Sequence, residues 1–290
     1  MNTKSIFPIL VVLCIALLSA CNSPKVVHVK NGDDLQAAIE LAEPGSILII
    51  EDGDYEQIFL KKSLTLINRS RGATIRGVDT VLGRGGVVTI GESENDSTVV
   101  VRLIGLTIIE DRHDGYKSAV RAIGLSDVDT RGGIDLHIDG CKLYTPTDAS
   151  MAETLATFQN VKINVKYSHI EGFRALAFWG GPSKVRNCTI VHRQDNRVLK
   201  RWTDPYDGNV EFSNNIFHHL ENAWGCGIAF GSDYEDGEVP SDLILNNNWF
   251  YSEEGTGFYA PVDLMGWDDG YLSIEEVQDI WPTNVYGYPY

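Results

Sequence analysis

A six-residue pattern recurs six times along this chain of 290 residues. Its copies begin and end on apolar residues, and they are LIGLTI from Leu103, IDGCKL from Ile138, VKYSHI from Val165, VRNCTI from Val185, FSNNIF from Phe212 and LNNNWF from Leu245. The copies follow one another at intervals of about 20 to 35 residues, and such irregular periods indicate a solenoid whose coils are joined by loops of variable length.

The third position of the pattern predicts a corner in the backbone. Glycine and asparagine tolerate left-handed backbone angles, and they occupy five of the six third positions: Gly105, Gly140, Tyr167, Asn187, Asn214 and Asn247. Apolar residues alternate before the corner and resume after it, as in strands with one buried face. Each copy is therefore predicted to be strand, corner, strand, and stacked copies predict a parallel β-helix with coils about 4.8 Å apart.

The fourth position follows the corner and is expected to point into the core. It holds small, apolar or amide side chains, namely Leu106, Cys141, Ser168, Cys188, Asn215 and Asn248. We expect the amides of Asn215 and Asn248 to pair along the axis, as asparagine ladders do. Cys141 and Cys188 are predicted to lie two coils apart, roughly 9–10 Å, whereas a disulfide needs Cα atoms within about 7 Å. These two cysteines are therefore expected to be free thiols that fill the core.

Both ends of the repeat carry helix signals. The stretch DDLQAAIELAEPG at 33–45 places four apolar residues on one helical face, with Asp33 or Asp34 as the cap and Pro-Gly as the stop. It predicts an amphipathic helix that covers the first coil. Near the other end, Ser273 and Glu276 form a capping-box pattern that predicts a short helix over 274–280.

The passage SILIIEDGDYEQIFLKKSLTLI, together with ATIRG at 73–77, resembles the opening of the pectin-lyase-like right-handed β-helix superfamily. That superfamily includes pectate lyases, pectin methylesterases, chondroitinase-B-like and alginate lyases, and NosD-like periplasmic proteins. The resemblance covers about 30–280 as a repeat pattern, and it specifies the fold more sharply than any activity. We therefore expect an all-β chain with a single right-handed parallel β-helix domain over 33–262 and a C-terminal capping segment over 263–290.

The N-terminus has the pattern of an export signal. A short polar start carries Lys4, an apolar run covers Ile6–Leu18, and Ser19-Ala20-Cys21 follows. This sequence resembles the bacterial lipoprotein box, which implies cleavage before Cys21 and lipid on its sulfur. An ordinary signal peptide with a chance cysteine is the alternative. We expect 1–20 to be a lipoprotein signal peptide and 21–32 a lipidated tether. We then expect the mature protein to be anchored to a bacterial envelope membrane. In a Gram-negative cell this is the outer membrane, with the protein facing the periplasm or the cell surface. We also expect a monomer.

The charge balance restricts the partners. The chain has 40 acidic and 24 basic residues, a formal net charge of −16, which argues against nucleic-acid binding. One segment reverses this sign, with a single acid, Asp195, among six bases: Lys184, Arg186, Arg193, Arg197, Lys200 and Arg201. This segment predicts attraction of an anionic ligand, and the alternative is a set of surface salt bridges.

The superfamily resemblance implies that a substrate lies along a groove over one of the parallel sheets. The strand after each repeat is the candidate, and these strands are predicted at 118–123, 154–158, 174–179, 198–202, 226–230 and 257–260. Lyases of uronic acids neutralise the substrate carboxylate and remove the neighbouring proton. Lys200 suits the base, because a neighbouring cation or burial lowers a lysine pKa, and Arg201 suits the carboxylate. His192 is kept as a possible acid or base.

Further residues are candidates for substrate binding. Arg121 and Arg174 occupy neighbouring predicted strands, and Arg193 and Arg197 lie in the basic segment. Trp179 and Trp202 are predicted at strand ends, where a flat indole can stack on a sugar ring. The alternative for these tryptophans is ordinary packing at the rim of the sheet.

Metal and cofactor signals are weak. Acidic residues cluster at 92–96 and 233–238, and carboxylates suit Ca²⁺, but solvated acidic loops explain them as well. The chain has no GxSxG, HExxH or phosphate-binding loop, and we expect no cofactor, with Ca²⁺ left open. The sequence therefore favours a membrane-tethered lyase that cleaves an acidic, uronate-containing polysaccharide by β-elimination. A non-catalytic solenoid that binds glycan or protein, and a glycoside hydrolase, remain the alternatives.

Overall fold

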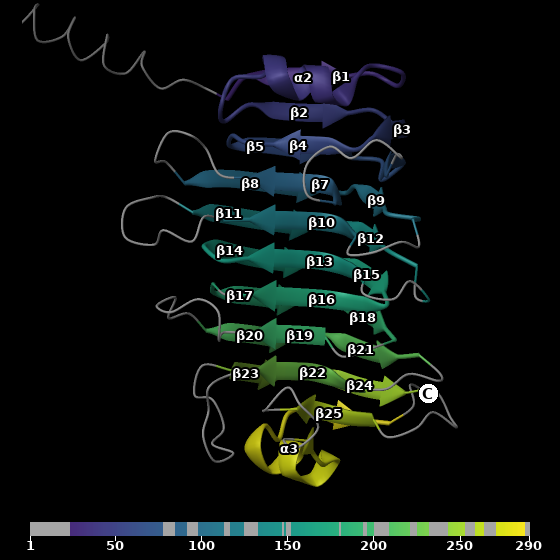
Figure 1. The fold of residues 1–290 in the computed structure, drawn as a ribbon, viewed down its shortest axis with the longest axis vertical. Helices are drawn as coiled ribbons and strands as arrows, with labels where there is room; N and C mark the ends of the chain where they lie inside the picture. The colour runs from purple at the N-terminus through teal and green to yellow at the C-terminus, as the bar shows by residue number, and fades with distance from the viewer. Residues whose placement is uncertain are drawn as a thin grey trace, which may run out of the picture.

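The computed structural model describes residues 24–77, 85–91, 98–112, 117–124, 133–146, 148, 152–179, 181–193, 196–199, 209–220, 225–231, 243–252, 259–263 and 271–287. Within these ranges the strands form three nine-stranded sheets, stacked coil upon coil (Figure 1). None of the helices in these ranges has the length and apolar character needed to cross a bilayer.

The three sheets are named here A, B and C. Sheet A contains β1 (Val26–Val29), β2 (Ile47–Ile50), β5 (Leu64–Ile67), β8 (Val99–Ile104), β11 (Ile134–Asp139), β14 (Val161–Lys166), β17 (Ser183–Arg186), β20 (Val210–Ser213) and β23 (Leu243–Asn246). Sheet B contains β3 (Gly53–Glu56), β6 (Ala73–Arg76), β9 (Thr107–Ile109), β12 (Lys142–Tyr144), β15 (His169–Gly172), β18 (Thr189–His192), β21 (Ile216–His219), β24 (Trp249–Ser252) and β27 (Val285–Tyr286). Sheet C contains β4 (Ile58–Leu60), β7 (Gly86–Gly91), β10 (Ser118–Ile123), β13 (Glu153–Phe158), β16 (Arg174–Trp179), β19 (Asn196–Leu199), β22 (Gly225–Gly231), β25 (Tyr259–Asp263) and β26 (Tyr271–Leu272).

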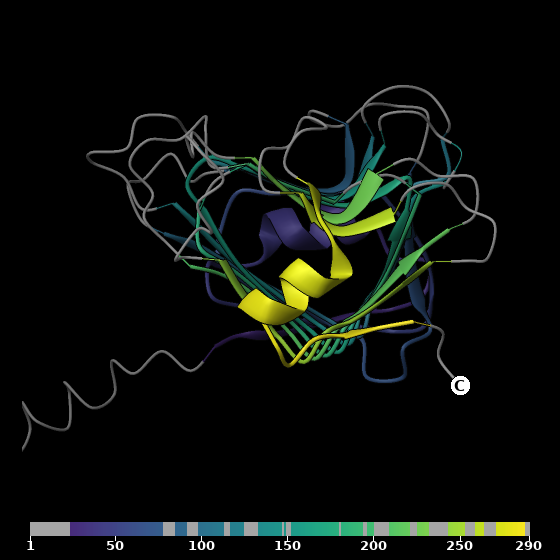
Figure 2. The same ribbon diagram turned by 90° about the horizontal axis from the view of Figure 1, so that it is seen from below.

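Each coil passes from sheet A through a short corner to sheet B, and then to sheet C before it returns. Neighbouring strands are parallel, apart from the pairing of β25 with β26. Equivalent positions of the repeat lie side by side, so that Val165 pairs with Ile138 on one side and Val185 on the other. The chain is therefore a right-handed parallel β-helix, as predicted, and Figure 2 shows its three sheets as the sides of a prism.

The corners between sheets A and B fall where the sequence predicts them. All six third positions have left-handed backbone angles, with φ from 51° at Tyr167 and Asn247 to 67° at Gly105. A Cβ atom at Gly105 would lie 2.2 Å from the backbone oxygen of Asn68, so this corner admits only glycine. Tyr167 adopts the same conformation although a bulky residue disfavours it.

The residues after the corners fill the core. Cys141 and Cys188 are buried and form no disulfide, and the coil that carries Ser168 lies between them. Burial raises the pKa of both thiols to about 11, so they stay protonated at neutral pH. The prediction that these cysteines are free core residues is confirmed.

The predicted amide pairing is also confirmed, and it extends one coil further. Asn215 Nδ2 donates to Asn248 Oδ1 at 3.0 Å, and Asn248 Nδ2 donates to Asn284 Oδ1 at 3.0 Å. Asn284 lies in the turn after the last helix, outside the repeat pattern. The ladder therefore ties the C-terminal segment to the coils above it.

A short helix lies at each end of the described stack (Figures 1 and 2). Helix α2 (Leu35–Leu41) begins after Asp34, whose side chain accepts a hydrogen bond from the backbone of Ala37. Helix α3 (Ile274–Ile280) begins with the predicted capping box, and its Val277 is buried. Both helix predictions are confirmed.

Candidate functional site

The basic segment of the sequence is divided among the three sheets. Lys184 and Arg186 lie on β17 in sheet A, Arg193 directly follows β18 in sheet B, and Arg197 lies on β19 in sheet C. Because one coil circles the molecule, residues that are close in the sequence face different directions. Lys200, Arg201 and Trp202 lie outside the described residues, as does the predicted lipidation site Cys21.

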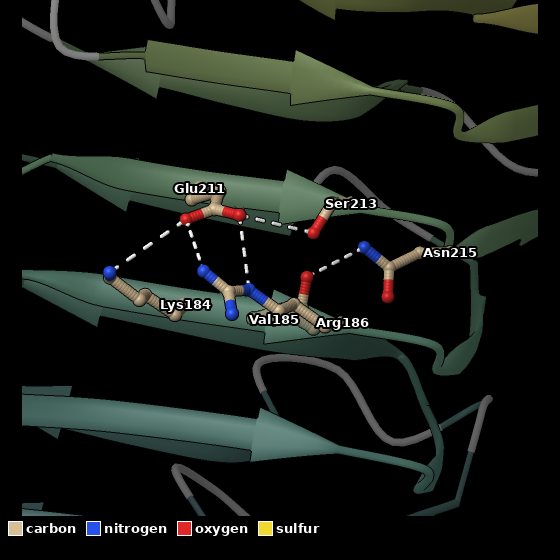
Figure 3. Close-up of polar contacts among 6 residues, drawn as sticks. All are labelled: Lys184, Val185, Arg186, Glu211, Ser213 and Asn215. Atoms are coloured by element: carbon tan, nitrogen blue, oxygen red, sulfur yellow. Dashed lines mark hydrogen bonds and ion pairs between the residues drawn. The ribbon is translucent and has the colours of Figure 1, made fainter.

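The two bases on sheet A share one carboxylate, that of Glu211 (Figure 3). Arg186 donates from Nε and Nη2 to Glu211, at 3.0 and 2.6 Å, and Lys184 Nζ lies 3.9 Å from the same carboxylate. Ser213 also donates to Glu211, at 3.2 Å. The hydrogen bonds from Arg186 hold the pKa of Glu211 below its ordinary value. For these two bases the alternative interpretation, surface salt bridges, holds.

Two other candidates lie inside the wall of the prism. Arg174 pairs with Glu153, Nη1 to Oε1 at 3.3 Å, and both side chains are almost fully buried. His192 has no exposed surface, and its ring lies edge-on to His219 with centroids 5.0 Å apart. Neither Arg174 nor His192 faces the exposed side of its sheet.

The outer side of sheet C carries a row of one cation and two rings. Phe158 and Trp179 are in register on neighbouring coils, and their rings stack with centroids 5.9 Å apart and planes 9° apart. The guanidinium carbon of Arg121, on the coil before, lies 4.5 Å from the centre of the Phe158 ring. All three side chains are half-buried. We call Arg121, Phe158 and Trp179 the platform.

Sequence reasoning found Arg121 and Trp179 but missed Phe158. A single phenylalanine at a strand end suggests core packing. The signal that identifies it is its register, because Phe158 and Trp179 occupy the same offset in successive strands of sheet C. Alternation within each strand then places both rings on the outer side.

Small, buried side chains lie beside the platform on the same side of sheet C. Ala156 and Ala177 are in register with Arg121 and β19 Arg197, so small side chains separate the rings from the next row. The indole Nε1 of Trp179 has no hydrogen-bond partner in the described part of the chain. A buried indole N–H normally finds a partner, and this nitrogen has almost no exposed surface of its own.

A resident metal site is not formed by the described residues. They contain no group of three or more histidine, cysteine, aspartate or glutamate side chains that could hold an ion. The two acidic stretches that suggested a Ca²⁺ site, 92–96 and 233–238, lie outside the described residues.

Comparison with known proteins gives a likeness of structure without one of sequence. No protein-family model and no curated protein matches the chain. Among solved structures, the PL6 family alginate lyase AlyGC matches in a mutant form, with a TM-score of 0.55 and 16% sequence identity over 92% of this chain. Another structure of AlyGC matches with a TM-score of 0.52 and 15% identity over 92% of this chain. The chain spans only 40% of the length of each of these structures, and at such identities the likeness shows the fold.

Proposed function

We propose that the outer side of sheet C binds an anionic, uronate-containing polysaccharide, and that the protein cleaves this polysaccharide by β-elimination. The observation that carries the proposal is the platform, a guanidinium followed by two stacked rings on three successive coils. The solved structures of similar fold support the substrate class, because they are alginate lyases.

The platform offers each type of contact that an acidic sugar needs. Phe158 lies between Arg121 and Trp179, so the outward edges of the two stacked rings offer apolar surface to a sugar whose hydroxyls stay in water. The fork of Arg121 can bind a carboxylate with two parallel hydrogen bonds. A chain of sugars that runs along the stack would meet these groups in steps of about 4.8 Å, the spacing of the coils.

Cleavage requires a base and a partner for the carboxylate. The base removes the proton on the carbon next to the carboxylate, the glycosidic C–O bond at the adjacent carbon breaks, a C=C bond forms, and the leaving oxygen takes up a proton. We assign the base to Lys200 and the carboxylate partner to Arg201. Both directly follow β19 in the sequence, and β19 pairs with β16, the strand that carries Trp179.

Binding and cleavage are tested separately. The purified protein is titrated with alginate, pectate and a glycosaminoglycan, and with a neutral polysaccharide as control. We expect Arg121→Met and Trp179→Ala to weaken binding to the acidic polymer at least tenfold. Arg102→Met on sheet A and Trp249→Ala on sheet B are the matched controls on other faces, and both should bind as the wild type does.

Cleavage is followed by the ultraviolet absorbance of unsaturated products. Lys200→Ala and Arg201→Ala should abolish it while binding remains. Binding without any product would favour the non-catalytic solenoid and contradict the lyase assignment. Absence of binding to every acidic polymer, or equal losses in Trp249→Ala and Trp179→Ala, would contradict the site.

A further inference from the structure

One corner between sheets A and B carries a residue that the fold does not favour. Tyr167 has φ 51° and is 63% exposed, whereas the equivalent corners hold glycine or asparagine. A left-handed conformation is unfavourable for a residue that has a Cβ atom. The exposed ring recovers little of this by burial. Strained residues of this kind concentrate at functional sites.

One cation lies beside the ring of Tyr167, and two more are carried by the preceding coils. Lys166 Nζ is 5.8 Å from the centre of the ring. Lys142 is exposed on the preceding coil, where it pairs in register with His169, two residues beyond Tyr167. In the described ranges Lys142 and Arg71 have no ion-pair partner, and Arg71 is exposed.

The side chain of Arg71 runs along this corner toward Tyr167. A Cβ atom at Gly105 would lie 3.7 Å from Arg71 Cγ, and one at Gly140, on the next coil, would lie 3.4 Å from Arg71 Nη2. The guanidinium therefore rests over Gly140, and the coil that follows carries Tyr167. The two glycines leave the space that this side chain occupies.

The nearby carboxylates pair with other residues than Arg71 and Lys142. Asp139 forms an ion pair with Lys166, with Oδ2 and Nζ 3.0 Å apart, and Glu171 pairs with His169, with Oε2 and Nε2 3.0 Å apart. Arg71 and Lys142 therefore present unneutralised charge beside an exposed ring, in a protein whose net charge is −16.

We propose that Tyr167, Arg71 and Lys142 form a second site, which binds a single anionic sugar residue. The Tyr167 ring takes the apolar face of the sugar, and the two cations take its carboxylate or sulfate group. The inference rests on the proposed function for its ligand class. The site lies at the corner of sheets A and B, whereas the platform lies on sheet C, the remaining side of the prism (Figure 2). Two separate sites on one polymer raise the avidity without any change in either.

The test is a calorimetric titration with short oligosaccharides, one carrying carboxylates and one carrying sulfates, and cleavage is monitored in parallel. We expect two equivalents to bind to the wild type with the preferred sugar, and the comparison of the two identifies the anion. Tyr167→Asn, Arg71→Met and Lys142→Met should each weaken one equivalent at least tenfold, while Trp179→Ala weakens the other. Lys162→Met on sheet A and Asn214→Gly at another corner are matched controls that should bind as the wild type does.

The tyrosine variant separates a functional role from a structural one. Tyr167→Asn should raise the melting temperature, because asparagine tolerates this backbone, and lower the affinity at the same time. A lower melting temperature would mean that the ring supports the fold and would overturn the inference. Binding of a single equivalent that Trp179→Ala removes and Tyr167→Asn leaves unchanged would also overturn the second site, while it would support binding at the platform. A single equivalent with the opposite response would support this site and contradict the platform, and no binding to either sugar would overturn both.

Discussion

At the scale of residues, two glutamate–arginine pairs differ in burial, and burial changes how much an ion pair matters to the free energy of unfolding. The side chains of Glu153 and Arg174 are 5% and 6% exposed, whereas those of Glu211 and Arg186 are 18% and 42% exposed. Loss of one partner removes part of the compensation of the other charge, which costs more inside the wall than at the surface.

The same substitution at the two sites should therefore have very different effects. We expect Glu153→Gln to lower the free energy of unfolding by about 3 kcal/mol or more, and Glu211→Gln to lower it by less than about 1 kcal/mol. Urea denaturation at neutral pH measures both. Equal losses would show that the Arg174 guanidinium is solvated in the folded protein.

The surface pair also predicts a dependence on pH. The hydrogen bonds from Arg186 lower the pKa of Glu211 from its ordinary value of 4.5. A lowered carboxyl pKa stabilises the folded state above the ordinary value, and this stabilisation is lost as the pH falls through the lowered one. The stability difference between the wild type and Glu211→Gln should be constant near neutral pH and vanish in acid. A difference that grows in acid would contradict the ion pair.

At the scale of elements, the asparagine ladder holds the last coils together. Asn248 is its central rung. Its Nδ2 donates to Phe212 O and to Asn284 Oδ1, and its Oδ1 accepts from the backbone and side-chain nitrogens of Asn215. All of these groups are buried, so none can turn to water if the rung is removed.

We expect Asn248→Ala to lower the free energy of unfolding by about 2–4 kcal/mol, since it leaves several buried polar groups without partners. Asn246→Ala is the matched control, because Asn246 is exposed on the same coil, and it should cost less than about 0.5 kcal/mol. Chemical denaturation of both variants gives the comparison. Similar losses at the two positions would mean that the ladder adds nothing to stability.

At the scale of the whole molecule, local features were predictable from the sequence and the site was only partly so. The corners and the helix caps depend on one residue and its immediate neighbours. Asn187 therefore predicts a corner, and Ser273 predicts a helix cap, from the sequence alone. Asn284 escaped because it follows a helix rather than a strand of the repeat. The platform depends on how each coil is aligned with the next, because Arg121, Phe158 and Trp179 lie on three successive coils that are separated in the sequence by segments of unequal length. Arg186 and Arg193 are close in the sequence, but they lie on different sheets, because the chain turns a corner between them.

Helix α3 lies at one end of the described stack of coils. Helix α3 packs its Val277 into the core beside β25 and β26, and an uncovered final coil would expose apolar surface and unpaired strand edges. We expect Val277→Asp to destabilise the protein and to produce species that grow with concentration in sedimentation velocity. Glu275→Gln, on the exposed side of the same helix, is the control and should sediment as the wild type does. If Val277→Asp instead keeps the wild-type sedimentation and stability, the last coil is protected by its own strands. The helix would then be an appendage rather than the cap of the solenoid.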